Sequence, residues 1–353
     1  MNQIKKKLIC VVGATASGKT GLGVALAKKF RGEIVSADSR QVYRGLNIGT
    51  GKDLAEYGNI NYHLIDICEP GEKFTMFDWL ELAKKVIDDI WKRGKTPVVV
   101  GGTGLYIQGL IKGFRIAKKL KPKTKNSNSK FKIYTRQELD SFDLKKLQLI
   151  AKKYRLITNE ANEANSYKLD INNSRRLIRY IEQMQAGETP TSHKINFDYI
   201  LIAPDWPREE LYRRIDKRVD DRFKEGMLEE VEGLIKDGVD IDWLLSLGLE
   251  YRIIGEYLIK NLKQFSNPSR LESRSEADLA IEPHFAPASG GASRGRQLNN
   301  GNYSEMVQDL KWKIHAYARR QLTWWRRFPI KWTDNQEQAK KICQKFLSID
   351  KQE

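Results

Sequence analysis

The eight residues Gly13-Ala14-Thr15-Ala16-Ser17-Gly18-Lys19-Thr20 decide the fold class of this chain. An apolar run precedes them, and a segment with helical apolar spacing follows them. This spacing is the P-loop pattern, in which backbone N–H groups and a helix N-terminus point at phosphate oxygens. Lys19 adds a positive charge, and the Thr20 hydroxyl is placed to bind Mg²⁺. We therefore predict a di- or triphosphate site at residues 13–20, with Mg²⁺ as its cofactor.

Apolar strand patterns alternate with helical patterns on both sides of this loop. Strands are predicted at residues 7–12, 34–37, 96–100 and 199–203, with a helix at residues 77–91. Strands that alternate with helices are typical of a parallel sheet covered on both faces. The predicted fold is α/β: a P-loop NTPase-like parallel sheet core flanked by helices, with a small helical insertion domain.

Composition and periodicity divide the chain into five parts. Residues 117–132 contain no acid and are rich in Lys, Asn and Ser, whereas residues 267–301 are rich in Ser, Arg, Asn, Gly and Pro. Such segments cannot bury enough apolar surface to pack as ordinary elements. The predicted parts are a first part of the P-loop core at 1–115, a small, basic, mostly helical insertion at 116–170, a continuation of the core with helices at 171–266, a disordered insertion at 267–301 and a C-terminal helical part of the core at 302–345.

The net charge limits the classes of partner. The chain has 353 residues and a formal charge of +17, which attracts polyanions, and nucleic acid is the favoured partner. A surplus of solubilising charge and contact with anionic lipid are the alternatives. No apolar run approaches the roughly 20 residues of a membrane span, and the N-terminus lacks a signal-peptide pattern. The three cysteines lie far apart, which argues against disulfides and zinc sites. We expect a cytoplasmic protein with no membrane contact, acting as a monomer.

Two polar residues follow predicted strands at the edge where the phosphate loop lies. Asp38 and Thr103 come directly after strands, and ligands of parallel sheets bind beyond the carboxyl ends of the strands. Asp38 has the chemistry of a general base, a Mg²⁺ ligand or a cap, and Thr103 that of an exposed hydroxyl or a turn residue. Asp66 is either a substitute metal ligand or a turn acid. Because no carboxylate directly follows the strand at 96–100, a transferase that holds a diphosphate fits better than a motor or switch.

Five further stretches carry a resemblance to a known family. They are Ser-Ala-Asp-Ser-Arg-Gln-Val-Tyr-Arg-Gly-Leu-Asn-Ile-Gly-Thr at 36–50, His-Leu-Ile-Asp-Ile at 63–67, Gly-Gly-Thr-Gly-Leu-Tyr-Ile at 101–107, Asn-Ser-Arg-Arg-Leu-Ile-Arg at 173–179 and Arg-Gln-Leu-Thr-Trp at 320–324. With the phosphate loop, they make the chain similar to the tRNA dimethylallyltransferases, also called isopentenyl-tRNA transferases or the IPP transferase family. The resemblance covers most of the chain except residues 116–168 and 267–301.

The resemblance implies a reaction and a set of roles. The family transfers a dimethylallyl group from dimethylallyl diphosphate to N6 of the adenosine 3′-adjacent to the anticodon in tRNA, releasing pyrophosphate. Carried over, Asp38 is the general base, Thr103 assists near the diphosphate, and Arg218 faces the diphosphate. Arg214, Arg218 and Arg222 recur every four residues, which alone suggests a solvated helix stripe. Only Arg218 gains a role, because Arg222 replaces an apolar residue usual in the family.

The same resemblance implies contacts with tRNA, particularly its anticodon stem-loop. The expected tRNA-binding residues are Asp38, Ser39, Arg40, Gln41, Arg175, Arg176, Leu177, Ile178, Arg179, Arg319, Arg320, Gln321, Trp324 and Arg326. Arginines suit phosphate contacts, and aromatic rings suit base stacking. Surface solubility is the alternative for the arginines, and a core position is the alternative for the tryptophans.

Three rival functions stay open at this point. Prenyl transfer to free AMP or ADP needs no basic footprint, and a P-loop small-molecule kinase needs a clearer metal-binding carboxylate. A non-catalytic RNA-binding ATPase would need neither Asp38 nor Thr103. One departure from the family lies at Gly248-Leu249-Glu250-Tyr251-Arg252, where two residues are added to the family's Gly-Tyr-Arg segment.

Overall fold

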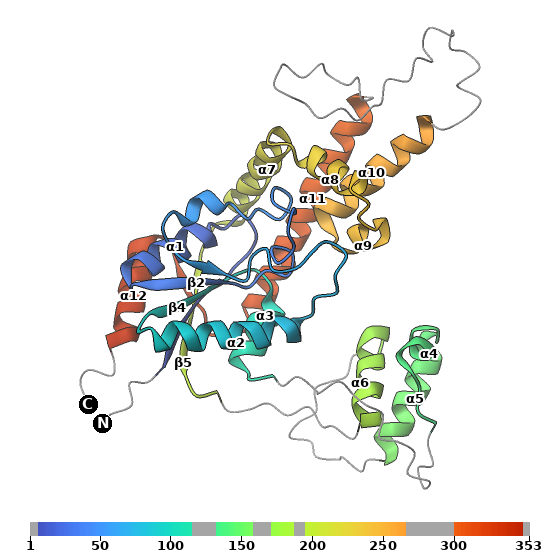
Figure 1. The fold of residues 1–353 in the computed structure, drawn as a ribbon, viewed down its shortest axis with the longest axis horizontal. Coiled ribbons are helices and arrows are strands. Elements are labelled where there is room, and N and C mark those ends of the chain that lie inside the picture. The colour runs from blue at the N-terminus through green and yellow to red at the C-terminus, as the bar shows by residue number, and fades with distance from the viewer. Residues whose placement is uncertain (1–5, 115–131, 158–170, 187–194, 266–299, 349–353) are drawn as a thin grey trace. The chain divides into compact units, whose positions relative to one another are not determined.

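A computed structural model describes residues 6–114, 132–157, 171–186, 195–265 and 300–348 (Figure 1). The chain forms two compact units, one from residues 1–111 and 195–353 and the other from residues 112–194. The basic stretch predicted at 117–132 and the disordered insertion predicted at 267–301 lie almost wholly outside the described residues. Within the described residues, no helix has both the length and the apolar character needed to cross a bilayer.

The larger unit is built on a six-stranded sheet in the order β3-β2-β4-β1-β5-β6, in which every neighbouring pair is parallel. The strands are β1 (Lys7–Val11), β2 (Gly32–Ser36), β3 (Tyr62–His63), β4 (Thr96–Val100), β5 (Asp198–Pro204) and β6 (Lys331–Thr333). The parallel α/β core predicted from the sequence is confirmed. The pattern missed β3 and β6, because strands of two and three residues are too short to show a period.

Strand β1 lies in the middle of the sheet, between β4 and β5. Leu8 to Val11 are completely buried, as expected for a strand covered on both faces. The central position matters for function because the phosphate loop directly follows β1. The loop therefore lies beside the segments that follow β4 and β5, and β2 ends at the same edge of the sheet on the far side of β4.

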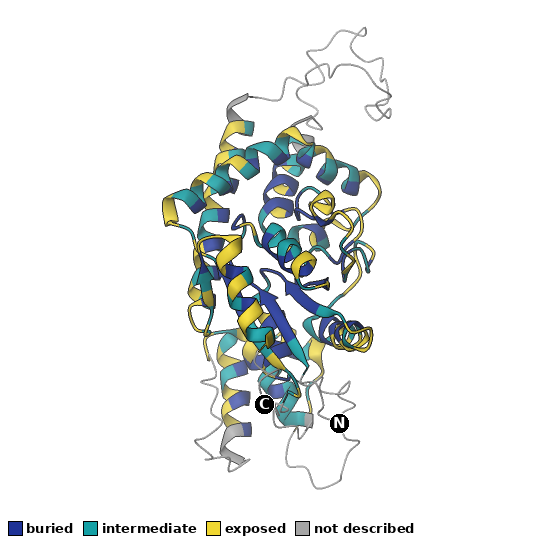
Figure 2. Ribbon diagram, turned by 90° about the vertical axis from the view of Figure 1, so that its left-hand side faces the viewer, coloured by how far each residue is buried: buried dark blue, intermediate teal, exposed yellow. Residues whose placement is uncertain are grey.

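Helices cover both faces of the sheet. On one face, α1 (Lys19–Lys29), η1 (Leu54–Tyr57) and α12 (Gln336–Ser348) share a core with the strands. Helices α2 (Met76–Lys92) and α3 (Gly104–Ile111) pack against each other, and α2 packs on β2 and β4. Helix α2 begins with a capping box, in which Thr75 and Asp78 exchange hydrogen bonds. Figure 2 shows the strands buried and the outward sides of the helices exposed.

A further group of helices supports the loop that follows β2. Its members are α7 (Arg208–Lys224), α8 (Met227–Lys236), α9 (Ile241–Ser246), α10 (Leu249–Phe265) and α11 (Asn300–Trp325). Their shared core includes Leu211, Ile215 and Leu310, and it also takes in Val42 and Leu46 from the loop. The segment after β2 is therefore anchored by burial on a helical base.

The smaller unit has its own apolar core. It contains α4 (Arg136–Asp140), α5 (Leu144–Ile157) and α6 (Ser174–Ala186), with Leu147, Ile150, Leu177 and Ile181 buried between them. The prediction that the core resumes at residue 171 is wrong, because this unit extends to residue 194 and includes α6. The apolar face of α6 was visible in the sequence, but periodicity does not tell against which core a face packs.

Candidate active site

The phosphate loop connects β1 to α1. Gly18 is the N-cap of α1 with φ +83°, a left-handed conformation that glycine adopts without a steric penalty. Lys19 Nζ donates to Ala14 O at 2.6 Å, so its side chain folds across its own loop. Burial and the neighbouring Arg218 lower the pKa of Lys19 to about 8, although Asp38 opposes them. Burial and the nearby positive charge therefore disfavour the charged form of Lys19, and a bound anion would favour it.

The two loops that carry Asp38 and Thr103 are bonded to each other. Thr103 N donates to Ala37 O at 3.2 Å, and Ser39 N donates to Thr103 Oγ1 at 3.1 Å. The Asp38 carboxylate accepts from Arg40 N at 2.9 Å, which fixes its direction at the start of its loop. The structure therefore brings together the acid and the hydroxyl that the sequence placed at neighbouring strand ends.

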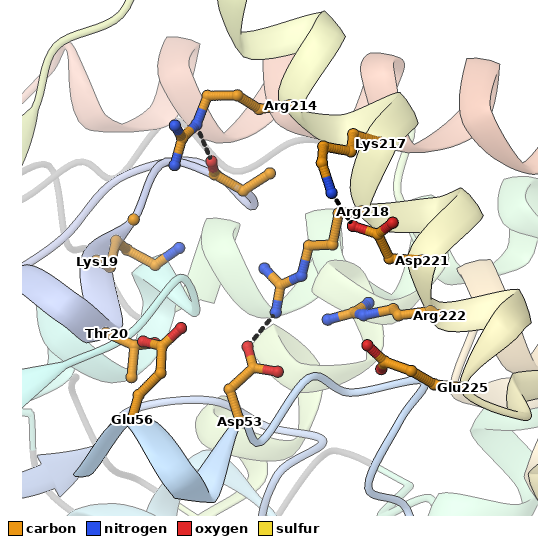
Figure 3. Close-up of a pocket in the computed structure, with 12 residues that line it drawn as sticks. Lys19, Thr20, Asp53, Glu56, Arg214, Lys217, Arg218, Asp221, Arg222 and Glu225 are labelled. Atoms are coloured by element: carbon orange, nitrogen blue, oxygen red, sulfur yellow. Dashed lines mark hydrogen bonds and ion pairs between the residues drawn. The ribbon is translucent and has the colours of Figure 1, made fainter. Parts of the chain in front are cut away.

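A cavity of about 340 Å³ opens in front of the phosphate loop (Figure 3). It is lined by Ala16, Gly18, Lys19, Thr20, Asp53, Glu56, Arg214, Lys217, Arg218, Asp221, Arg222 and Glu225. Arg218 Nη2 lies 2.8 Å from Asp53 Oδ2, and Arg214 Nε donates to Ala16 O at 3.0 Å. Helix α7 thus places a row of guanidinium groups opposite Lys19, and guanidinium groups suit the binding of phosphate oxygens.

Arg222, for which no role was predicted, is buried beside Arg218. A Cβ added to Gly51 would lie 1.8 Å from Arg222 Nη2 and 2.1 Å from Arg218 Nη2, so both guanidinium groups press against this glycine. Arg222 Nη1 donates to Gly49 O at 3.2 Å and lies 3.6 Å from Glu250 Oε1. Burial and Arg218 lower the pKa of Arg222 to about 10. The four-residue spacing of the arginines was the only signal for this neighbourhood.

Glu250 is the buried counter-charge of this region. Its Oε2 accepts from Arg40 Nη1 at 2.6 Å, and its side chain is only 5% exposed. Burial raises its pKa, but Arg40 and Arg222 outweigh burial and keep the pKa below its usual value. Glu250 lies in the segment where two residues depart from the family pattern. The departure is visible in the sequence, but the ion pairs that Glu250 forms with Arg40 and Arg222 are not.

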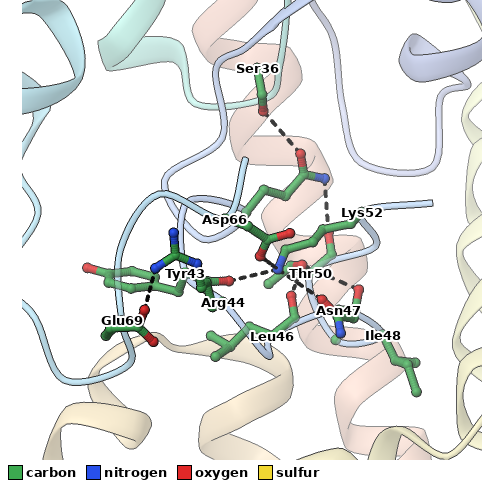
Figure 4. A network of polar contacts seen from close by, with 12 residues as sticks. Ser36, Tyr43, Arg44, Leu46, Asn47, Ile48, Thr50, Lys52, Asp66 and Glu69 are labelled. Atoms are coloured by element: carbon green, nitrogen blue, oxygen red, sulfur yellow. Dashed lines mark hydrogen bonds and ion pairs between the residues drawn. The ribbon is translucent and has the colours of Figure 1, made fainter. Parts of the chain in front are cut away.

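A second network braces the loop from β2 to Lys52 (Figure 4). Lys52 is 1% exposed, donates to Tyr43 O at 2.7 Å and forms an ion pair with Asp66. Asp66, considered above as a metal ligand, thus neutralises a buried lysine and does not line the cavity. Gln41 accepts from Ser36 Oγ at 3.1 Å and donates to Gly51 O at 2.9 Å. Both ends of this side-chain amide support the loop.

The residues expected to contact tRNA separate into exposed and buried groups. Ser39, Arg175, Arg176, Arg319, Arg320 and Arg326 are exposed, whereas Asp38, Arg40, Gln41, Arg179 and Trp324 are partly buried. Arg319 Nη1 donates to Tyr212 Oη at 2.8 Å, and Arg179 pairs with Glu182 at 3.5 Å. Leu177 and Ile178 are 0% and 3% exposed in the core of the smaller unit, so their side chains do not reach a partner's surface. Gln321 is also buried.

The residues around Thr20 fit a magnesium ion. Asp53 and Glu56 line the same cavity as Thr20, and hydroxyl and carboxylate oxygens are ligands that Mg²⁺ prefers. Burial and the neighbouring Asp53 raise the pKa of Glu56, although Arg218 opposes them, and a divalent cation would relieve this repulsion. Within the described ranges, no three His, Cys, Asp or Glu residues cluster closely enough to hold a metal ion. Phosphate oxygens and water would therefore complete the coordination.

The sheet order and the loop after β1 define a P-loop protein, and a basic cavity opens beside that loop. The family described as IPP transferase matches residues 41–328, and one described as isopentenyl transferase matches residues 6–59. The chain belongs to the IPP transferase family.

Similar proteins cover nearly the whole chain. The chain is 36% identical to a tRNA dimethylallyltransferase 2 of Shewanella sediminis over 91% of this chain and 89% of that protein. It is 40% identical to a tRNA dimethylallyltransferase 2 of Treponema denticola over 73% of this chain and 84% of that protein. Among solved structures, the tRNA isopentenylpyrophosphate transferase of Bacillus halodurans is 29% identical, with a TM-score of 0.63 over 98% of this chain and 96% of the other.

Proposed function

We propose that this protein transfers a dimethylallyl group from dimethylallyl diphosphate to N6 of the adenosine 3′-adjacent to the anticodon in tRNA, releasing pyrophosphate. The observation that carries the proposal is the bonded pair of loops that brings Asp38 and Thr103 beside the phosphate loop, in a chain of the IPP transferase family. A base and a polyphosphate cradle on one sheet edge suit alkylation of an amine by a diphosphate ester.

Asp38 acts as the general base in this proposal. N6 of adenosine attacks C1 of the dimethylallyl group, the bond from C1 to the diphosphate oxygen breaks, and the N6 proton passes to Asp38. The amine becomes acidic only as the new C–N bond forms, so an ordinary carboxylate is a sufficient base. The backbone bond from Arg40 N holds this carboxylate in place.

The basic cavity stabilises the leaving group. Negative charge grows on the pyrophosphate as the C–O bond breaks, and Lys19, Arg218 and the loop amides, which line one cavity, are proposed to stabilise it. Bound Mg²⁺, held by the Thr20 hydroxyl with phosphate oxygens, would supply further positive charge there. Thr103 is proposed to direct its hydroxyl towards the reacting end of the diphosphate.

The arginines outside the cavity, some exposed and some partly buried, are proposed to contact tRNA. The adenosine has to leave its stack, at a cost of about a few kcal/mol, before it can reach Asp38. Ser39 and Arg40 adjoin Asp38 on the same loop and are proposed to contact the extruded nucleotide. Arg175, Arg176, Arg179, Arg319, Arg320 and Arg326 are proposed to contact the RNA backbone, which would make affinity strongly dependent on salt. One copy of the chain supplies all the cradle residues, and we propose that it acts as a monomer.

The test is incubation with Mg²⁺, labelled dimethylallyl diphosphate, and either unmodified tRNA or AMP. We expect label in tRNA, and a rate roughly 10²- to 10⁴-fold lower for Asp38→Asn. Asp237→Asn is the matched control, because Asp237 is an exposed acid at the end of α8. Label in AMP alone would assign the protein to free-nucleotide prenylation. No transfer to either acceptor would overturn the proposal.

A further inference from the structure

A single side chain joins the phosphate loop to the loop that carries Thr103. Gln321 lies on α11 and is 8% exposed. Its Oε1 accepts from Thr15 N at 2.8 Å, and its Nε2 donates to Gly102 O at 3.1 Å. The two ends of one amide therefore hold backbone groups of two different loops, 306 residues and 219 residues away in the sequence.

The primary amide of Gln321 satisfies both loops at once. Thr15 presents a donor and Gly102 presents an acceptor, so the bridging group needs an acceptor and a donor on the same planar end. A carboxylate would accept from Thr15 but repel the Gly102 carbonyl, and a thioether would satisfy neither. A buried backbone group left without its partner costs about 1–3 kcal/mol. The loops would then shift to recover hydrogen bonds.

The packing on both sides of Thr103 has the same origin. A Cβ on Gly102 would lie 2.7 Å from Gln321 Nε2, and a Cβ on Gly104 would lie 2.3 Å from Trp324 Nε1. Neither glycine beside Thr103 has room for a larger side chain, because Gln321 and Trp324 fill that space. These two residues lie almost one helical turn apart on α11. Thr103 stands between these two closely packed glycines, and its Oγ1 accepts from Ser39 N at 3.1 Å.

We infer that Gln321 is a positioning residue of the active site, which fixes the phosphate loop and the Thr103 loop relative to each other and does not contact RNA. Its neighbour Arg320 is exposed, because consecutive residues on a helix point about 100° apart. In the Arg320-Gln321 motif, the first side chain is therefore exposed and the second is buried and bonded to the two loops. The inference rests on the proposed function for its link to catalysis.

The first test compares Gln321→Met with Gln308→Met, an exposed glutamine on the same helix. We expect Gln321→Met to lower kcat about 10- to 100-fold, because small displacements of reacting groups cost that much, and to leave the Kd for tRNA unchanged. Gln308→Met should match the wild type in both. A raised Kd for tRNA at unchanged kcat would instead make Gln321 an RNA contact and overturn the inference.

A double-mutant cycle tests whether Gln321 acts through Thr103. In a Thr103→Ala background, the further cost of Gln321→Met should shrink, because the hydroxyl that it positions is already gone. If the fold-loss of kcat in the double variant equals the product of the two single fold-losses, the inference is contradicted. Gly102→Ala disturbs the same contact from the side of the loop, because the added Cβ would lie 2.7 Å from Gln321 Nε2. It should therefore cause a similar loss of kcat. This variant answers the question even if Gln321→Met fails to fold.

Binding of inorganic pyrophosphate, measured by calorimetry, separates this inference from the proposed function. Gln321→Met should weaken binding about tenfold because the phosphate loop loses its brace, whereas Gln308→Met should not. If the effect on binding appears but the wild type transfers no prenyl group to tRNA, the proposed function fails and the positioning role stands. If transfer occurs and Gln321→Met binds pyrophosphate and turns over like the wild type, the positioning role fails.

Discussion

Arg40 Nη1 lies 2.6 Å from Glu250 Oε2, and this buried ion pair ties the loop after β2 to helix α10. Arg222 approaches the other carboxylate oxygen at 3.6 Å, so Glu250 is shared by two arginines from different elements. One of these arginines adjoins the proposed base, and the other lines the phosphate cavity. Glu250 therefore connects both halves of the site through its charge.

Replacing Glu250 by glutamine should destabilise the larger unit. The change leaves Arg40 and Arg222 buried without their counter-charge, and breaking a buried ion pair costs about 3–5 kcal/mol. The free energy of unfolding in urea measures the loss. Glu256→Gln, at an exposed position on the same helix, should change it by less than about 0.5 kcal/mol. Equal effects of the two variants would show that the network contributes nothing to stability.

Arg222→Met should weaken diphosphate binding. Arg222 adds a second guanidinium beside Arg218 in the cavity, and its loss should raise the Kd for dimethylallyl diphosphate about tenfold. Arg213→Met, an exposed change on the same helix, serves as the control. A Kd equal to that of the wild type, with a lowered melting temperature, would assign Arg222 a purely structural role.

Diphosphate binding should fall as pH rises above about 8. Burial and Arg218 lower the pKa of Lys19 to about 8, so its positive charge is present below that pH and lost above it. The Kd for dimethylallyl diphosphate should therefore rise steadily from pH 8 to 10, when followed by calorimetry. Lys19→Arg should not show this rise between pH 8 and 9, because a guanidinium stays protonated there and even Arg222, whose pKa is lowered in the same cavity, has a pKa of about 10. A flat wild-type profile would contradict the lowered pKa.

Neighbouring residues of α6 should respond to different measurements. Leu177→Ala opens a cavity in the core of the smaller unit and should lower the free energy of unfolding by about 2–5 kcal/mol.

Arg175→Ala should leave the free energy of unfolding unchanged but weaken tRNA binding and reduce the slope of log K against log salt by roughly one. Lys152→Ala, an exposed change on α5, is the control for added charge loss. Arg175→Ala that binds tRNA like the wild type at every salt concentration would remove this residue from the interface.

The central fold could be predicted from the sequence because its signals are local. The phosphate loop is a contiguous motif, and the strands beside it are apolar runs bounded by turns. The same sheet logic correctly brought Asp38 and Thr103 together, since parallel strands end at one edge. The two short edge strands carry no such signal, because two or three residues cannot show alternation. The sequence also does not show that α6 packs in the core of the smaller unit, because an apolar helix face does not identify its partner.

The hydrogen bonds and ion pairs of the site could not be predicted, because they join side chains that are far apart in the sequence. Nothing near Glu250 in the sequence indicates that it pairs with Arg40, 210 residues away. Gln321 was grouped with the exposed Arg320 because a motif does not state which side chain points inward. For Leu177 and Ile178 the information was present, since their helical apolar spacing already indicated burial.

The bridge from Gln321 to Thr15 also has a consequence for biosynthesis. A ribosome makes the phosphate loop at the start of the chain and the side chain that braces it 306 residues later. Strand β6, which completes the sheet edge, emerges later still. A nascent chain can form α1 early, but β1 has to wait for its partners β4 and β5, and the phosphate loop lacks its bond to Gln321 until α11 docks. A chain that stops short of α11 therefore carries the complete motif without the side chain that bonds Thr15 and Gly102.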